Sequence, residues 1–249
     1  MLLPHPFVPK LLDTLVAEVD EWGARRPSPS NISQCSRQHW FRVRRWRRTN
    51  LPRAGSVLAA DEGWLVEPKV FSMLEKLGCR VERDVDCDWE FWRGDPGTPD
   101  GAIWQPGDSP QEGMIVDAKR LGMWSYISLL EKGLRGSKPE YYDQMQLYMT
   151  ASGLKVALVV ALCADPAGTG WVWKTIKKRQ DELPPLWVEE VALDRERVNE
   201  LCVRERWIDD MIEMVDEPAR VTREFNPQTT NFPCNYCGWQ DSCVEAGEQ

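Results

Sequence analysis

The sequence has no apolar run that approaches the ~20 residues of a membrane-spanning helix. Its first residues, MLLPHPFVPKLL, show neither the basic lead nor the small-residue cleavage site of a secretory signal peptide. Internal repeats and low-complexity tracts are missing as well. We therefore expect a protein without membrane contact that works in the cytoplasm.

The sequence has too few cysteines for a disulfide scaffold and fewer basic than acidic residues. Eight cysteines in 249 residues are too few for a disulfide scaffold, so cysteines that cluster in the sequence point to a metal site. The net charge of −8 excludes a protein that coats nucleic acid indiscriminately, because such binding is mainly phosphate neutralisation. A local basic groove stays compatible with this charge. No G-x-x-x-x-G-K-[ST] loop is present, so any helicase partner is a separate chain.

The remaining composition is that of a globular protein, with 42% hydrophobic and 28% charged residues, and the length predicts one domain over 1–249. Apolar residues at helical spacing predict helices over 10–22, 32–48, 56–78, 139–153 and 194–215. Extended patterns predict strands over 79–92, 99–105, 113–120, 155–164, 170–178 and 186–193, the first three as an antiparallel meander. The segment 121–139 is expected to be a polar, mobile connection, and the cysteine-rich tail to be irregular.

Helix boundaries are marked by polar caps, proline and glycine. Ser30 or Asn31 is expected to cap the helix over 32–48. Pro68 is expected to kink or restart the next helix, and Gly78 to end it.

Two aspartates and a lysine on neighbouring predicted strands form the candidate catalytic set. If the hairpin turns near Asp108, Asp100 and Asp117 lie at equal distances from the turn and face each other. Asp117 and Lys119 are two positions apart on one strand, so they share a face. Two carboxylates and the backbone carbonyl of Ala118 suit Mg²⁺, and Lys119 is placed to hold or deprotonate an attacking water.

The alternative is that these residues are solvated charges on an edge hairpin, since a D-x-K triplet also occurs by chance. Ile115, Val116 and Ala118 surround Asp117, however. A charge within an apolar strand usually needs a partner or a metal. This context therefore favours a catalytic, metal-binding role for these residues.

Four sequence elements in this order resemble the RecB-type branch of the PD-(D/E)XK nuclease superfamily. They are GWLVE at 63–67, PD at 99–100, DAK at 117–119 and QMQLY at 144–148. The chain is also similar to the CRISPR-associated four-cysteine exonucleases and the AddB-type nuclease domain. The resemblance implies an α/β fold with a restriction-endonuclease-like core, in which helices flank a mixed central sheet, and an N/C-terminal cysteine-cluster subregion.

The resemblance assigns catalytic roles to six residues, which are Glu67, Asp100, Asp117, Lys119, Gln144 and Tyr148. The three acids, with the Ala118 carbonyl, are the expected ligands of Mg²⁺ or Mn²⁺, and the lysine is expected to assist the water. Gln144 and Tyr148 share a helical face and are expected to position the lysine or a DNA phosphate. The alternative is that they are ordinary helix residues without a role in the site. Nucleases with the cysteine cluster often have histidine in place of Glu67, and Glu62 is the alternative ligand.

A second candidate site lies in the tail. Cys234, Cys237 and Cys243 supply three thiolates at chelating spacing, which leaves room for one more ligand. The resemblance implies that this ligand is Cys35 and that the four cysteines hold a [4Fe-4S] cluster. Zinc is the alternative, because four thiolates also make a structural zinc site.

Arginines concentrate in and after the predicted helix over 32–48. Arg37, Arg44, Arg45 and Arg48 are the expected contacts to the phosphates of single-stranded DNA. The alternative is that they pair with surface acids. Residues 28–53 and 227–249 together are expected to form the cysteine-cluster and DNA-entry subregion.

These features predict a metal-dependent DNA exonuclease that acts on single-stranded DNA or DNA ends. The resemblance implies work in recombination, repair or CRISPR spacer acquisition, includes phage-encoded enzymes, and allows a helicase or integrase as protein partner. The contrasting hypothesis is a non-catalytic DNA-end binding or structural module that keeps the nuclease fold.

Overall fold

The computed structural model describes residues 26–46, 63–164, 184–218, 221, 224–225, 234 and 237–247. The chain divides into two compact units. Unit 1 comprises Met1–Asp61, Trp92–Asp95 and Cys202–Gln249, and unit 2 comprises Glu62–Phe91 and Pro96–Leu201. The helix expected over 10–22 and the strand expected over 170–178 lie outside the described residues. The single nuclease domain over 1–249 stays a prediction.

Unit 2 contains a five-stranded mixed sheet in the order β1-β2-β3-β4-β5. The strands are β1 (Arg80–Glu82), β2 (Gly101–Trp104), β3 (Met114–Leu121), β4 (Val156–Cys163) and β5 (Leu186–Ala192). The expected meander is confirmed, since β1, β2 and β3 pair antiparallel. β3 and β4 pair parallel, and β5 returns antiparallel to β4. A parallel pair needs a crossover, which α5 (Met123–Ser137) and α6 (Pro139–Ser152) provide.

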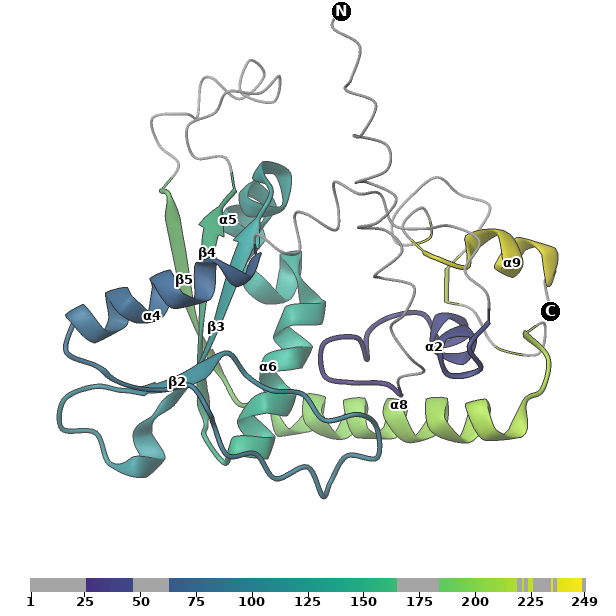
Figure 1. Ribbon diagram of the computed structural model, residues 1–249, viewed down its shortest axis with the longest axis horizontal. Coiled ribbons are helices and arrows are strands. Elements are labelled where there is room, and N and C mark those ends of the chain that lie inside the picture. Colours follow the sequence, from purple (N-terminus) through teal and green to yellow (C-terminus); the bar gives the residue numbers. More distant parts are fainter. Residues whose placement is uncertain are drawn as a thin grey trace, which may run out of the picture. The chain divides into compact units, whose positions relative to one another are not determined.

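Helices cover both faces of the sheet (Figure 1). α4 (Val66–Lys76) packs Val70 and Phe71 against one face, where Val116 and Ala118 of β3 point. α5 and α6 pack against the other face, where Ile115 points. The α/β class with a mixed sheet between helices is therefore confirmed. The side chains of Asp117 and Lys119 follow the alternation of β3 and project toward the α6 side.

The sequence pattern predicts a polar, mobile connection over 121–139 and no helix, and this prediction is wrong because α5 occupies most of the segment. Its apolar residues recur at helical spacing and are buried on the sheet; they are Met123, Tyr126, Ile127, Leu129 and Leu134. Glycines and charged residues between them make this apolar spacing hard to recognise in the sequence. Gly133 breaks the helix with a φ of 67°, and the next N–H, that of Leu134, donates to the Glu189 carboxylate at 3.0 Å.

The other helices and strands differ from the predicted ones mainly in length. The strand expected over 79–92 shrinks to β1, and in the irregular remainder the Asp88 N–H donates to the Ala151 carbonyl at 2.8 Å. α4 begins just before Pro68, in agreement with a restart there, and Gly78 follows its end with a φ of 88°. α6 and α8 (Arg195–Met214) match their predicted ranges closely.

In unit 1, the helix expected over 32–48 is observed as α2 (Ser36–Val43). The proposed cap by Ser30 or Asn31 is wrong, because the Asn31 side chain accepts the Ser28 N–H at 2.9 Å and closes a turn before the helix. The tail contains a short helix, α9 (Gln240–Glu245). Among the helices that the structure describes, none is long and apolar enough to cross a membrane.

Candidate active site and cysteine cavity

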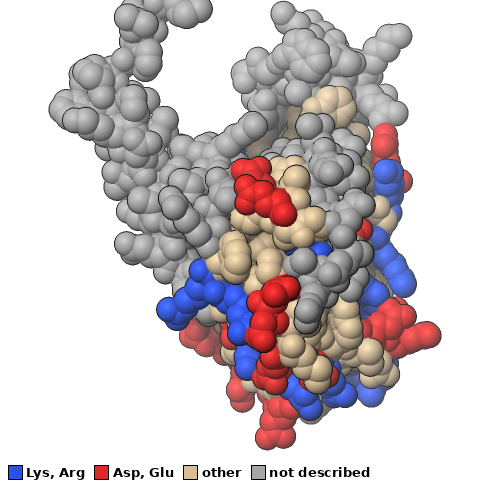
Figure 2. All heavy atoms as spheres, turned by 90° about the vertical axis from the view of Figure 1, so that its right-hand side faces the viewer, with Lys and Arg blue, Asp and Glu red and all other residues tan. Residues whose placement is uncertain are grey.

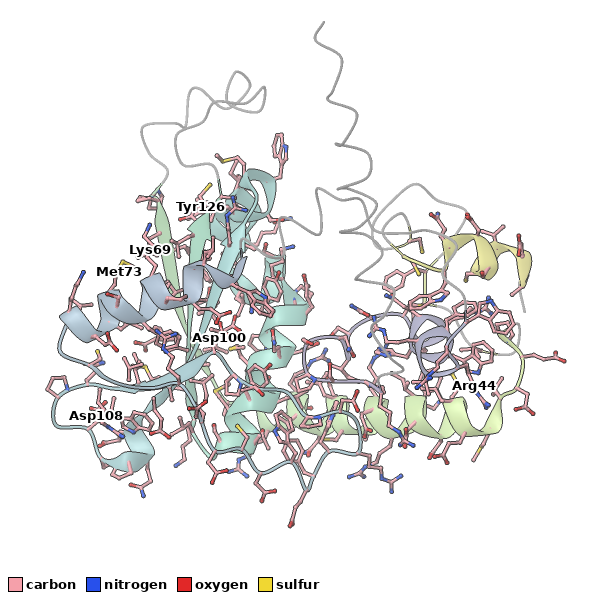
Figure 3. All side chains as sticks on the ribbon, viewed as in Figure 1. Arg44, Lys69, Met73, Asp100, Asp108 and Tyr126 are labelled. Carbon is pink, nitrogen blue, oxygen red and sulfur yellow. The ribbon has the colours of Figure 1, made fainter. Side chains whose placement is uncertain are left out.

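The strand register brings the two aspartates face to face. Gly101 of β2 pairs with Val116 of β3, so Asp100, one residue before β2, falls opposite Asp117, as predicted. An Asp100 Oδ2 atom accepts the Ala118 N–H at 2.8 Å. Figure 3 shows Asp100 in the centre of unit 2, between α4 and α6. The hairpin itself therefore positions this carboxylate.

Gly101 has a steric reason to follow Asp100. A Cβ atom at this position would lie 2.6 Å from the Phe71 ring of α4 and 2.8 Å from the Glu82 carbonyl oxygen of β1. These separations are far below van der Waals contact. The glycine lets α4 pack tightly beside the strand that carries Asp100.

Lys119 pairs with one oxygen of Asp117. Its Nζ donates to Asp117 Oδ1 at 2.7 Å, and the Asp117 side chain is 0% exposed while that of Lys119 is 20% exposed. The second oxygen, Asp117 Oδ2, is buried and has no hydrogen-bond partner among the described residues. A buried oxygen left in this way is costly unless it meets a donor or a cation.

The electrostatics of the site make one carboxyl a weak acid and the lysine a stable cation. Burial, followed by the Asp117 carboxylate, raises the pKa of Asp100 to about 7, although Lys119 opposes this. Burial lowers the pKa of Lys119, but the carboxylates of Asp117 and Asp100 outweigh it and raise that pKa above its ordinary value.

Glu67 lies in a different layer from Asp117 and Lys119. It lies half-buried in the first turn of α4, on the sheet face opposite α6. Its negative charge adds the smallest of the named contributions to the raised pKa of Asp100. Glu67 is therefore near Asp100, while the alternative ligand Glu62 lies outside the described residues.

α6 presents three side chains toward the acid-lysine set. Gln144 Nε2 donates to the Tyr148 hydroxyl at 3.0 Å, and both residues are buried. Burial raises the pKa of Tyr148 to about 12, against the opposing hydrogen bond from Gln144, so the phenol stays neutral. The Tyr141 ring lies 5.1 Å from Lys119 Nζ, close enough for a cation–π contact. The sequence reasoning missed Tyr141, although its spacing of three from Gln144 was the available signal.

Other residues of α6 hold the helix in place. Gln146 donates to the Ala192 carbonyl at 3.1 Å and accepts the Asp194 N–H at 2.6 Å. The buried Asp143 carboxylate accepts two hydrogen bonds from the Arg197 guanidinium, at 2.7 and 2.8 Å. A bidentate pair of this kind fixes orientation as well as distance. The face with Gln144 and Tyr148 is thereby directed at β3.

The carboxylate pair fits a divalent cation by its donor chemistry. Asp117 Oδ2 is a buried oxygen without a partner in the described chain, and burial, followed by the repulsion of Asp117, raises the pKa of Asp100. A hard cation between two carboxylates removes both penalties. Within the described residues, however, no group of three or more His, Cys, Asp or Glu side chains is already arranged to hold a metal ion. Metal binding therefore belongs to the proposals below.

The raised pKa of Asp100 predicts how stability depends on pH. The folded protein keeps a proton on Asp100 that the unfolded chain releases near the ordinary aspartate pKa, so folding stability falls as the pH rises toward about 7. Mg²⁺ or Mn²⁺ is expected to offset this loss, and to raise the unfolding temperature more at about pH 8 than at about pH 5.5. Differential scanning fluorimetry measures both effects.

Asp100→Asn is the informative variant for this prediction. It is expected to flatten the pH dependence and to remove the metal-induced rise, whereas Glu75→Gln, at an exposed carboxylate of α4, keeps both. Unchanged metal stabilisation in Asp100→Asn would contradict a role for this carboxylate.

Unit 1 gathers the four cysteines of the second predicted site. Cys35, Cys234, Cys237 and Cys243 line one cavity, together with Arg37 and Phe41. Burial, the largest cause in each case, raises the pKa of Cys35 and of Cys237 to about 11. Sulfur donors that stay protonated in a buried cavity are converted to thiolates by a thiophilic metal, so the donor chemistry suits such a centre. The four cysteines are among the described residues, however, and in these no group of three or more ligands is already arranged around a metal position.

The expected DNA-binding arginines have different environments. Arg37 is 2% exposed, so its assignment as a phosphate contact is corrected. Arg44 donates to the Ile212 carbonyl at 2.8 Å. Arg45 is exposed, and Arg48 lies outside the described residues. On the face drawn in Figure 2, acidic and basic side chains are interspersed, and the described residues form no broad basic patch there.

Comparisons with known proteins identify the fold. No protein-family model matches the sequence, and no curated protein matches it. The alkaline exonuclease LHK-Exo from Laribacter hongkongensis has a similar structure, with a TM-score of 0.51 at 19% identity over 81% of this chain and 92% of that chain. LHK-Exo in complex with dAMP gives a TM-score of 0.50 at 16% identity over 83% and 93%. The chain thus has the restriction-endonuclease-like α/β fold of this exonuclease.

Proposed function

We propose that the protein is a metal-dependent DNA exonuclease of the PD-(D/E)XK type. The observation that carries the proposal is the facing pair Asp100 and Asp117, with Lys119 bonded to Asp117 at 2.7 Å. The fold shared with an alkaline exonuclease, one of whose structures contains dAMP, supports the same conclusion. A binding module has little use for an acid-acid-lysine set that includes a buried carboxylate, that of Asp117.

In this proposal, Asp100, Asp117 and the Ala118 carbonyl hold Mg²⁺ or Mn²⁺, and Glu67 contributes from α4. When bound there, such an ion would lower the pKa of a water molecule and would supply positive charge at the scissile phosphate. Lys119 adds a fixed positive charge at the same point, where charge develops in the transition state. Gln144 and Tyr148 position the lysine or a phosphate oxygen.

We further propose that Cys35, Cys234, Cys237 and Cys243 hold a [4Fe-4S] cluster, with zinc as the alternative. The shared cavity of the four thiols supports this assignment. A brown protein with visible absorbance favours iron and sulfide, whereas a colourless protein with stoichiometric zinc favours the alternative.

The proposed substrate is single-stranded DNA or a DNA end. Arg45 and Trp46 are exposed in unit 1, and together they offer a cation and a stacking surface. Recombination, repair and CRISPR spacer acquisition are the proposed settings, including a phage-encoded enzyme, with a helicase or an integrase as a separate protein partner.

The test is incubation of end-labelled single-stranded DNA with Mg²⁺ or Mn²⁺. We expect progressive shortening by the wild type and by Asp210→Asn, which changes an exposed aspartate of α8. Asp117→Asn is expected to leave the DNA intact. Cleavage retained in Asp117→Asn would refute the proposed active site, and metal-independent DNA binding without cleavage by the wild type would identify a binding module.

A further inference from the structure

Arg37 is a buried cation beside the cysteine cavity. It lies in α2, is 2% exposed, and lines the cavity with the four cysteines. A guanidinium loses much hydration on burial, so a buried arginine is retained where its donors meet well-placed acceptors. The acceptors of Arg37 therefore indicate its role.

The guanidinium donates hydrogen bonds to acceptors in the described C-terminal part of unit 1. Its Nε and Nη2 atoms donate to the Val221 carbonyl at 3.0 and 2.6 Å. Its Nη1 donates to the Gly247 carbonyl at 3.3 Å and to the sulfur of Cys243 at 3.6 Å. The backbone contacts lie on both sides of Cys243 in the sequence, and the sulfur contact places the positive charge against that cysteine.

We propose that Arg37 stabilises the thiolate of Cys243 when the cysteine cavity holds its metal, and so slows loss of that metal. The inference rests on the proposed four-cysteine centre. Four thiolates give such a centre a net negative charge, and an N–H donor with a fixed positive charge stabilises it. Arginine suits this position because its planar fork reaches the sulfur and the backbone carbonyls at the same time, which a lysine ammonium cannot do.

Arg37→Gln in the full-length protein tests the proposal. Loss of a residue that supports a metal ligand typically costs 10–100-fold in metal affinity, so we expect the variant to release its metal to EDTA about tenfold faster than the wild type. Metal content after timed exposure is measured by mass spectrometry. Arg44→Gln is the matched control, because Arg44 also donates to a backbone carbonyl, that of Ile212, while no cysteine is among its named partners; it is expected to release metal at the wild-type rate.

A spectroscopic readout separates charge at the sulfur from simple anchoring of the tail. Protein freed of its own metal and given Co²⁺ alone is expected to show a thiolate-to-cobalt charge-transfer band. In Arg37→Gln this band is expected at lower energy, because the sulfur has lost a donor. Arg37→Lys, which keeps the charge, is expected to lie between the two in band energy and in release rate, and it decides the matter if Arg37→Gln does not fold.

The outcomes are distinct. Faster release with a shifted band supports the proposal. Release at the wild-type rate, or faster release without a band shift, overturns it and leaves the four-cysteine centre standing. A wild-type protein that binds neither iron, zinc nor Co²⁺ overturns the centre and this inference together, whereas the DNA cleavage assay tests the nuclease site separately.

Discussion

Lys119→Met is expected to lower the rate of DNA cleavage about 10²–10³-fold, which is the usual effect of removing one group that stabilises transition-state charge. Lys119 bonds one oxygen of Asp117 and is kept protonated by the two neighbouring carboxylates. It is not a metal ligand in the proposed site. Metal-dependent thermal stabilisation should therefore survive in Lys119→Met, while Asp117→Asn loses both cleavage and stabilisation. Single-turnover cleavage and scanning fluorimetry measure the two properties.

Lys155→Met is the matched control for Lys119→Met. Lys155 is exposed and immediately precedes β4, six residues along the chain from Ala161, the β4 partner of Lys119. That separation corresponds to about 20 Å along a strand. Cleavage at the wild-type rate is expected in this control. An equal loss in both variants, or no loss in Lys119→Met, would contradict the role of Lys119.

Cys237→Ser is expected to abolish stoichiometric metal binding and to lower the unfolding temperature of the protein. Cys237 lies in the cavity with the other three cysteines, and burial raises the pKa of its thiol to about 11. Structural metal centres contribute on the order of 10 kcal/mol to the folding of small domains, so the loss is expected to be large. Metal analysis and a thermal melt provide the readouts.

The matched control is Cys202→Ser. Cys202 belongs to the same unit and is half-buried in α8, but it does not line the cavity. It is expected to keep the full metal content and nearly the wild-type unfolding temperature. If Cys237→Ser also keeps its metal, Cys237 is not a ligand.

Local sequence patterns determined the catalytic hairpin. Strand pairing follows from the positions of residues relative to one turn, so Asp100 could be placed opposite Asp117 without a structure. The period of two placed Lys119 on the face of Asp117, and the helical period placed Gln144 with Tyr148. Spacing also identified the three cysteines of the tail. All of these relations lie within one or two neighbouring elements.

Burial between distant segments was decided only by the tertiary structure. Arg37 belongs to a run of arginines that reads as a basic surface, yet its guanidinium is enclosed by residues about 200 positions away, including Cys243. In α5, apolar residues diluted by glycine and charge still form a helix, because the sheet offers them a surface to cover. Packing energy of this kind exceeds local propensity and leaves little trace in the sequence.

In the two candidate sites, too, some residues are placed by local sequence pattern and others by tertiary structure. Asp100, Asp117 and Lys119 are set by hairpin register and strand alternation, which the sequence encodes directly. Other relations join elements far apart in the chain. They are the contact of Tyr141 with Lys119, the electrostatic effect of Glu67 on Asp100, and the shared cavity of Cys35 and the tail cysteines. Periodicity describes one element at a time, so it could not bring these residues together. The family resemblance implied the places of Glu67 and Cys35, whereas the contact of Tyr141 came only from the folded structure.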